Sequence, residues 1–169
     1  MSVLHGSFTV TREINAPLPR VWDAYSVEQS RSAWRQIPGP DSVLTLDFRV
    51  GGWERLTGIS AANGMAEVIA SHALFLDIVE HERIVACHEV LLNGIRRWVS
   101  LISLAFEPIG AAARITHTEQ YTFLTWAADG AHDQAHLRGS TQLAFNGLAA
   151  LVEPAPETAM KTALPRSGC

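Results

Sequence analysis

Four ionisable or hydroxyl-bearing side chains form a candidate polar cluster: Glu54, His117, Glu119 and Tyr121. The last three are spaced two residues apart, and polar residues alternate with them, so they share the covered face of one strand. An apolar pocket disfavours the charged form of a carboxyl group, which raises its pKa and permits general acid or base catalysis near neutral pH. A neighbouring imidazole could share or relay the proton. This pattern predicts acid–base chemistry with Glu119, His117 and Glu54 as candidate catalytic residues.

The same cluster allows two other interpretations. Each polar group could be hydrogen-bonded to a neighbouring side chain or a buried water and serve only to fix the fold. Alternatively, the groups could orient a ligand in an otherwise apolar pocket. Because buried ionisable groups mark functional sites only statistically, all three interpretations stay open at the level of sequence.

Other chemistry-bearing residues give weaker signals. His132 and His136 have HxxxH spacing, which would place both imidazoles on one face of a helix, but no third ligand is evident, so neither a metal site nor a cofactor is predicted. Cys87 lies in an apolar stretch and is expected to be a small buried residue, and a bridge to the final residue, Cys169, is not expected. The sequence contains no GxSxG, GxGxxG, P-loop or HExxH motif.

The elements that must position these residues are mostly strands. Period-two alternation, β-branched residues and turn signals predict strands over residues 7–14, 43–50, 53–59, 66–79, 84–92, 96–107 and 113–123. The strongest hairpin signal is Asn93-Gly94, because both central residues of a type I′ turn need positive φ. Segregated helices and antiparallel strands make the fold class α+β, with a curved sheet of about seven strands.

Three helices are expected, two short ones after the first strand and one long one at the end. Pro19 suits a first helical turn, a second helix is predicted over 28–34, and the last over 133–152. The last helix carries an apolar stripe of Leu137, Thr141, Ala144, Phe145, Leu148, Leu151 and Val152. Gly139 and Gly147 cost helix propensity, which indicates close packing or a nearby ligand.

Length and composition define the class of protein. The chain has 169 residues, with 47% hydrophobic and 18% charged residues, as expected of one folded domain. We expect this domain to cover 1–152 and the Pro-containing tail, 153–169, to be disordered. The net charge of −4 argues against nucleic acid as a partner. No apolar run could span a membrane, the N-terminus resembles no signal peptide, and two cysteines suit a reducing compartment, so the predicted location is cytoplasmic.

Several strings, in order, resemble the SRPBCC superfamily of START-like, Bet v 1-like helix-grip domains, and most closely the group named after the activator of the heat-shock-protein-90 ATPase. Together they extend from residue 8 to residue 152. The strings are FTVTREINAPLPRVWDAYS, DFRVGGWERL at 47–56, DIVEHERIV at 77–85, SLISLAFEPIG at 100–110, RITHTEQYTF at 114–123 and LRGSTQLAFNGL at 137–148.

The resemblance implies that the sheet grips the last helix around an internal cavity for a hydrophobic or aromatic, lipid- or polyketide-like small molecule. It also implies that Glu54 and Leu56 face the cavity while Trp53 and Arg55 face outward. Tyr121 departs from the family pattern, which more often has Gly there, and its bulk should shrink or reshape the pocket. The residues expected to line the ligand are Glu54, Leu56, Trp98, Ile102, His117, Glu119, Tyr121, Phe123, Thr141 and Phe145.

Two other functions stay open beside ligand binding. One is a cofactor-independent cyclase, hydrolase or dehydratase (lyase) that uses the Glu and His residues of the cavity. The other is a chaperone cofactor, which only the family resemblance suggests. A homodimer is also left open, since nothing in the sequence measures the oligomeric state.

Overall fold

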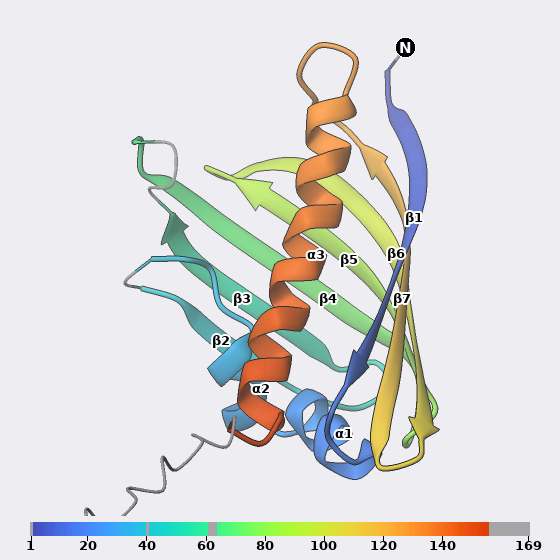
Figure 1. Cartoon of the computed structure of the whole chain (residues 1–169). Coiled ribbons are helices and arrows are strands. Elements are labelled where there is room, and N and C mark those ends of the chain that lie inside the picture. Colours follow the sequence, from blue (N-terminus) through green and yellow to red (C-terminus); the bar gives the residue numbers. More distant parts are fainter. Residues whose placement is uncertain (1, 40, 61–63, 156–169) are drawn as a thin grey trace, which may run out of the picture.

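The fold is a curved sheet wrapped around one long helix (Figure 1). The computed structural model describes residues 2–39, 41–60 and 64–155. The elements, in order, are β1 (Leu4–Ile14), α1 (Leu18–Ser26), α2 (Glu28–Trp34), β2 (Val43–Leu46), β3 (Trp53–Ser60), β4 (Glu67–Val79), β5 (Arg83–Leu92), β6 (Ile95–Ile109), β7 (Ala112–Phe123) and α3 (Ala131–Val152). The predicted α+β class is confirmed.

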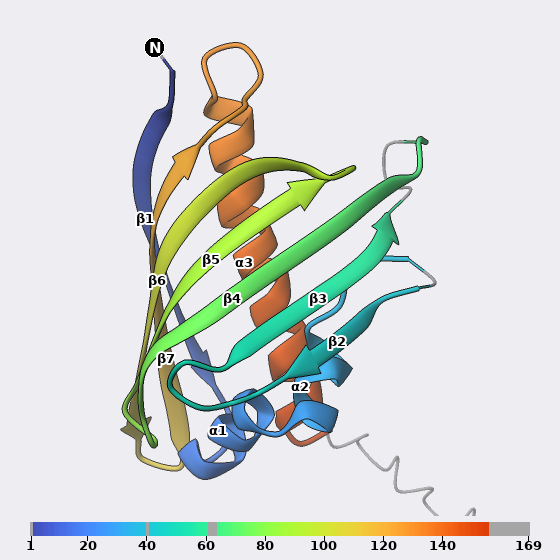
Figure 2. The same ribbon diagram turned by 180° about the vertical axis from the view of Figure 1, so that it is seen from behind.

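The seven strands form one antiparallel sheet in the order β1-β7-β6-β5-β4-β3-β2. Helix α3 crosses the inner face of this sheet, and α1 and α2 close one end of it (Figure 1). The view from behind shows no helix over the outer face (Figure 2). In the described part of the chain, no helix is long and apolar enough to cross a membrane.

Most predicted elements are confirmed, and the clearest differences concern turns. Asn93 and Gly94 both have positive φ, 51° and 78°, as the predicted hairpin turn requires. Strand β2 ends at Leu46 rather than residue 50, because the backbone of 47–52 folds into turns in which Gly52 N–H donates to the Arg49 carbonyl. The loop predicted at 61–64 falls largely outside the described residues, as do Cys169 and all of the predicted disordered tail beyond residue 155.

Helix α3 begins two residues earlier than predicted, after Gly130, whose φ of 83° is in the left-handed region. Its buried stripe matches the prediction with one error: Leu151 is 38% exposed, and Ala149 occupies the buried position instead. Gly147 meets the close-packing expectation, because a Cβ there would lie 3.1 Å from the carbonyl oxygen of Trp34. Nothing lies near the corresponding atom of Gly139.

The buried apolar residues form three clusters, which the partly buried Phe8 and Leu46 connect, since each packs against two of them. The largest lies where α1, α2 and the last turns of α3 meet the sheet, and it includes Trp22 and Phe106. A second, the β2–β3 cluster, consists of Ile37, Leu44 and Leu56. A third, the β7–α3 cluster, consists of Tyr121, Phe123 and Leu137. A small domain usually has one continuous core, so the polar side chains that lie beside these clusters on the inner face need explanation.

The burial prediction for Cys87 is also wrong. Cys87 is exposed on the outer face of the sheet, because its neighbours in β5, Ala86 and His88, both point inward and are buried. Strand alternation therefore decides the environment of the thiol, although the surrounding stretch is apolar.

Candidate functional site

A row of buried polar side chains crosses the inner face of the sheet between the apolar clusters. The strand register pairs Glu54 with Ala73, Ala73 with His88, and His88 with Ser100, so these residues lie at one level on four adjacent strands. Glu119 lies on β7, the next strand, diagonal to Ser100. Glu54 and Glu119 are only 3% and 2% exposed, which makes two nearly inaccessible carboxyl groups on one face.

Glu54 occupies the α2 end of the row and is bound by two arginines of that helix region. Arg31 Nε lies 2.5 Å from Oε2 of Glu54, and Arg35 Nε lies 3.5 Å from Oε1. The Arg31 guanidinium also lies over the rings of Tyr25 and Trp34, at 4.7 and 4.6 Å from their centroids. Burial raises the pKa of Glu54, but the charges of Arg31 and Arg35 outweigh burial, and the pKa lies below its ordinary value.

Glu119 occupies the opposite end and is bound by neutral or titratable donors. The Ser100 hydroxyl donates to Oε1 over 2.5 Å, and His117 Nε2 lies 3.1 Å from Oε2, so that nitrogen carries a hydrogen when the carboxylate is ionised. Burial again raises the pKa of Glu119, but the His117 hydrogen bond, the nearby His88 and the Ser100 hydroxyl together lower it below its ordinary value.

His88 lies between the two carboxylates and hydrogen-bonds to neither. Its Nε2 lies 2.8 Å from the hydroxyl oxygen of Ser71 on β4. Burial lowers the pKa of His88 to about 4, against the weaker pull of Glu119 and Glu54. The ring is therefore neutral at pH 7.

Three buried nitrogens on this side of the sheet have no hydrogen-bond partner among the described residues. They are Nη1 of Arg31, Nδ1 of His88 and Nε1 of Trp98. A buried donor without a partner costs free energy, so natural folds rarely retain one without a use for it. A water molecule or another hydrogen-bonding group could satisfy these three nitrogens.

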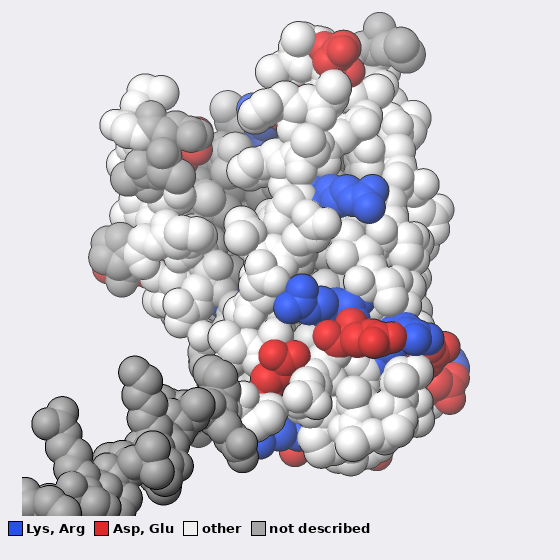
Figure 3. All heavy atoms as spheres, in the orientation of Figure 1, with Lys and Arg blue, Asp and Glu red and all other residues white. Residues whose placement is uncertain are grey.

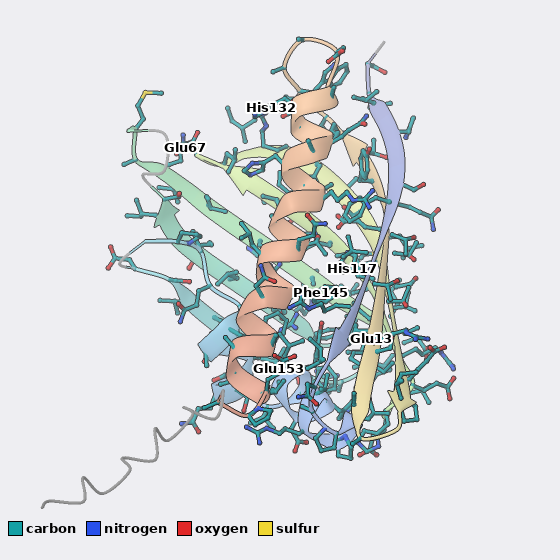
Figure 4. All side chains as sticks on the ribbon, in the orientation of Figure 1. Glu13, Glu67, His117, His132, Phe145 and Glu153 are labelled. Atoms are coloured by element: carbon teal, nitrogen blue, oxygen red, sulfur yellow. The ribbon has the colours of Figure 1, made fainter. Side chains whose placement is uncertain are left out.

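The helix side of the site carries apolar residues and one hydroxyl. Phe145 of α3 packs edge-on against His117, with ring centroids 6.3 Å apart, and Figure 4 shows the two residues facing each other between α3 and β7. Thr141 is buried, but its hydroxyl donates to the Leu137 carbonyl one turn earlier in the helix. His132 lies at the far end of α3 (Figure 4), and it and His136 are exposed. The described residues contain no group of three side chains suited to a metal ion.

The side chain of Tyr121 lies toward β1, at the edge of the sheet, rather than in the polar row. Its ring lies 4.9 Å from that of Phe123 and 6.3 Å from that of Phe8, and a Cβ on Gly6 would come within 2.1 Å of its hydroxyl oxygen. Gly6 of β1 therefore provides the space in which this phenol lies. Burial and the nearby Glu119 raise its pKa.

The structure gives the predicted site residues clear positions. Glu54 and Leu56 are buried on the inner face, while Trp53 and Arg55 are exposed, as the family phasing implied. The remaining predicted residues also lie on the inner strand faces or on the buried side of α3: Trp98, Ile102, His117, Glu119, Tyr121, Phe123, Thr141 and Phe145. However, Glu54 and the His117–Glu119 pair form two separate hydrogen-bonded groups, not one cluster.

Two aspects of the sequence prediction need correction. The expected rise in the carboxyl pKa values is wrong, because each carboxylate has enough donors or cations around it to outweigh burial. Sequence reasoning also missed Arg31, Ser71, His88 and Ser100. The signal for His88 was present: Ile84, Ala86, His88 and Val90 alternate with the other residues of β5 and mark its covered face.

The surface adds two shallow hollows and a recess. A hollow of about 540 Å³ includes Trp53, Leu74 and Cys87, and another of about 590 Å³ includes Gly6 and Tyr121; most of the residues around both belong to the outer face. On the opposite side, Figure 3 shows charged residues gathered at the α1 end, and a recess between α3 and the ends of β3 and β4. The internal cavity inferred from the resemblance stays a prediction.

A curved antiparallel sheet closed by one C-terminal helix over a partly polar inner face defines a helix-grip domain of the SRPBCC, Bet v 1-like class. The family model described as "Activator of Hsp90 ATPase homolog 1-like protein" matches residues 15–153. The chain belongs to this family, as its sequence motifs indicated.

Solved structures agree with this assignment. A protein from Rhizobium leguminosarum is 30% identical, with a TM-score of 0.75, and the match covers 89% of this chain and 95% of that one. Ara h 8.0201 shares the fold alone, at 11% identity and a TM-score of 0.65, over 87% of this chain and 97% of that one.

A curated relative matches over a shorter stretch. The ADP-forming succinate–CoA ligase subunit beta of Cupriavidus taiwanensis is 33% identical over 75 residues, which is 43% of this chain. The aligned stretch spans only 19% of the length of that protein.

Proposed function

We propose that the protein binds a hydrophobic or aromatic small molecule between the inner face of the sheet and α3. The observation that supports this most directly is the inner face itself: apolar clusters lie beside a row of buried polar groups that includes nitrogens without a partner among the described residues. Ligand sites are typically apolar walls with a few polar groups that fix orientation. The Bet v 1-like fold commonly serves this purpose.

The aromatic side chains on the inner face of the sheet suit a flat, apolar ligand. Trp98 and Phe123 form an edge-to-face pair with ring centroids 5.9 Å apart, and Leu137 of α3 packs in the same cluster. Trp98 and Ile102 are only partly buried, although they lie on the inner face of β6. A ligand seated there would cover apolar surface that the protein leaves partly accessible.

General acid catalysis by either glutamate fits the site less well. A general acid must hold a proton at the working pH, whereas the lowered pKa of both Glu54 and Glu119 keeps them ionised near neutrality. Glu119 is also occupied by two donors. Its carboxylate supports an orienting role, and turnover that is lost in Glu119→Gln but retained in Ser100→Ala would favour the enzymatic alternative.

Native mass spectrometry of freshly purified protein, followed by thermal unfolding with a panel of lipids, polyketides and aromatic compounds, tests the proposal. We expect a retained small molecule or a rise in Tm. Thr141→Phe adds bulk on the buried side of α3 and should abolish the rise, whereas Leu143→Phe, at a position 69% exposed on the same helix, should not. If no compound is retained or raises Tm, or if both variants behave alike, the proposal fails.

A further inference from the structure

We propose that His88 and Trp98 recognise a hydrogen-bond acceptor on the ligand, and that this ligand is an uncharged, largely apolar molecule with a carbonyl-type oxygen. The inference rests on the proposed function and specifies the chemistry of the ligand. It concerns a residue pair in the middle of the polar row, distinct from the Glu119–His117 pair.

The strand register brings the two side chains together. His88 on β5 is paired with Ser100 on β6, and Trp98 precedes Ser100 by two residues, so it lies on the same face and diagonal to His88. Diagonal neighbours on one face of an antiparallel pair have their Cα atoms about 7–8 Å apart, within reach of long and aromatic side chains. His88 bonds toward Ser71 on β4 and Trp98 packs on Phe123 of β7, so a ligand placed between them would meet the two residues from opposite sides through one oxygen or two on the same ring system.

The hydrogen-bonding character of the free atoms selects an acceptor. The indole Nε1 of Trp98 only donates, and so does the third unpartnered atom, Nη1 of Arg31. In the neutral ring of His88, Nδ1–H is a donor whenever Nε2 accepts the Ser71 hydroxyl hydrogen, and that contact is 2.8 Å long. All three free positions can thus be satisfied by oxygen atoms that accept hydrogen bonds.

The charges around the row select against an ion. The buried part of the row already contains two cationic groups, Arg31 and Arg35, and two carboxylates, Glu54 and Glu119. A ligand carboxylate would add a third negative charge to a row whose two carboxylates already match its two guanidinium groups, and an ammonium group would face the donors of His88 and Trp98. Either ion would lose its hydration without a new counterion, which makes its burial costly.

Three rigid compounds of one shape test the inference: fluorene, fluorenone and fluorene-9-carboxylate. Calorimetry with the full chain should give about tenfold tighter binding of fluorenone than of fluorene, as two neutral hydrogen bonds allow. The carboxylate should bind at least about tenfold more weakly than fluorene. In NMR spectra, the indole N–H resonance of Trp98 is identified by its absence in Trp98→Phe. Fluorenone should shift this resonance, and fluorene should not.

Two variants locate the recognition. His88→Phe and Trp98→Phe each keep an aromatic ring and remove a donor, so each should bring the fluorenone and fluorene affinities within about threefold of each other. Equal binding of the two compounds to the unchanged protein, or tighter binding of the carboxylate, overturns this inference and leaves ligand binding in place. Absence of binding by all three compounds counts against the proposed function itself. If His88→Phe does not fold, the resonance shift and the affinities of Trp98→Phe still test the inference.

Discussion

Glu54 and Glu119 are two carboxylates on the same face of the same sheet, almost equally buried, yet they are held in different ways. Glu54 is bound by two guanidinium groups from α2 and the residue that follows it, and these carry charge at every accessible pH. Glu119 is bound by a serine hydroxyl and an imidazole, both from the sheet itself.

The difference predicts a structural role for Glu54, and under the proposed function it makes Glu119 the carboxylate available to a ligand. The Glu54 pair ties α2 to β3, and removal of either partner would leave an unbalanced charge in the interior. The Glu119 carboxylate is held by a hydroxyl whose hydrogen can rotate and by an imidazole, neither of which carries a permanent charge. The two ends of one polar row therefore differ in what they contribute to stability and to function.

Glu54→Gln should have the largest effect on stability. The variant leaves Arg31 and Arg35 near the interior without their counterion, and breaking a buried ion pair on one side typically costs about 4 kcal/mol. Urea unfolding followed by circular dichroism measures the loss. Glu80→Gln is the matched control, because Glu80 is exposed and should change the free energy of unfolding by less than about 0.5 kcal/mol. A comparable loss in both variants would contradict a structural role for Glu54.

His88 divides the two ends and should make stability depend on pH between about 6.5 and 4. Because burial lowers its folded pKa to about 4, the unfolded chain binds the proton first as pH falls, and the folded state loses up to about 3 kcal/mol over this window. The groups that face the imidazole are Glu119, Arg35, Glu54 and His117.

Chemical unfolding at several pH values measures this dependence. His88→Gln removes the titration and should flatten the curve between pH 6.5 and 4.5, while the decline below pH 4.5, which belongs to the carboxyl groups, persists. His132→Gln, at an exposed position, should leave the curve unchanged. A slope retained in His88→Gln would assign the dependence to another group.

The sheet could be predicted from the sequence because its cause is local. Alternation in β7 and the Asn93-Gly94 turn determine strand, face and hairpin without reference to distant residues. The extent of β2 and the burial of Leu151 could not be predicted in this way, since a turn's hydrogen bonds and the angle of α3 on the sheet decide them. The exposed Cys87 shows that strand parity outweighs the apolar character of a stretch.

The site was predictable only in part, for the same physical reason. Alternation predicts the burial of Glu119 and the family resemblance that of Glu54, but their pKa values depend on partners brought by other elements. Arg31 reaches Glu54 from α2, and Ser100 reaches Glu119 from the neighbouring strand. No spacing rule along one segment reveals such contacts, and the sign of the pKa shift was therefore wrong.

Glu119→Gln should have a smaller effect than the other two changes and sharpens the contrast with Glu54. The amide keeps one oxygen as an acceptor for Ser100 or His117, and no permanent cation loses its partner, so we expect a loss of about 1.5 kcal/mol at pH 7. The lowered pKa of Glu119 contributes stability that is present above its unfolded pKa and lost as pH falls through the folded one, so the variant should also unfold with a shallower dependence below pH 4.5. Urea unfolding between pH 3 and 7 measures both effects, with Glu107→Gln on the outer surface as the control. A loss as large as that of Glu54→Gln would show that the two carboxylates are equivalent.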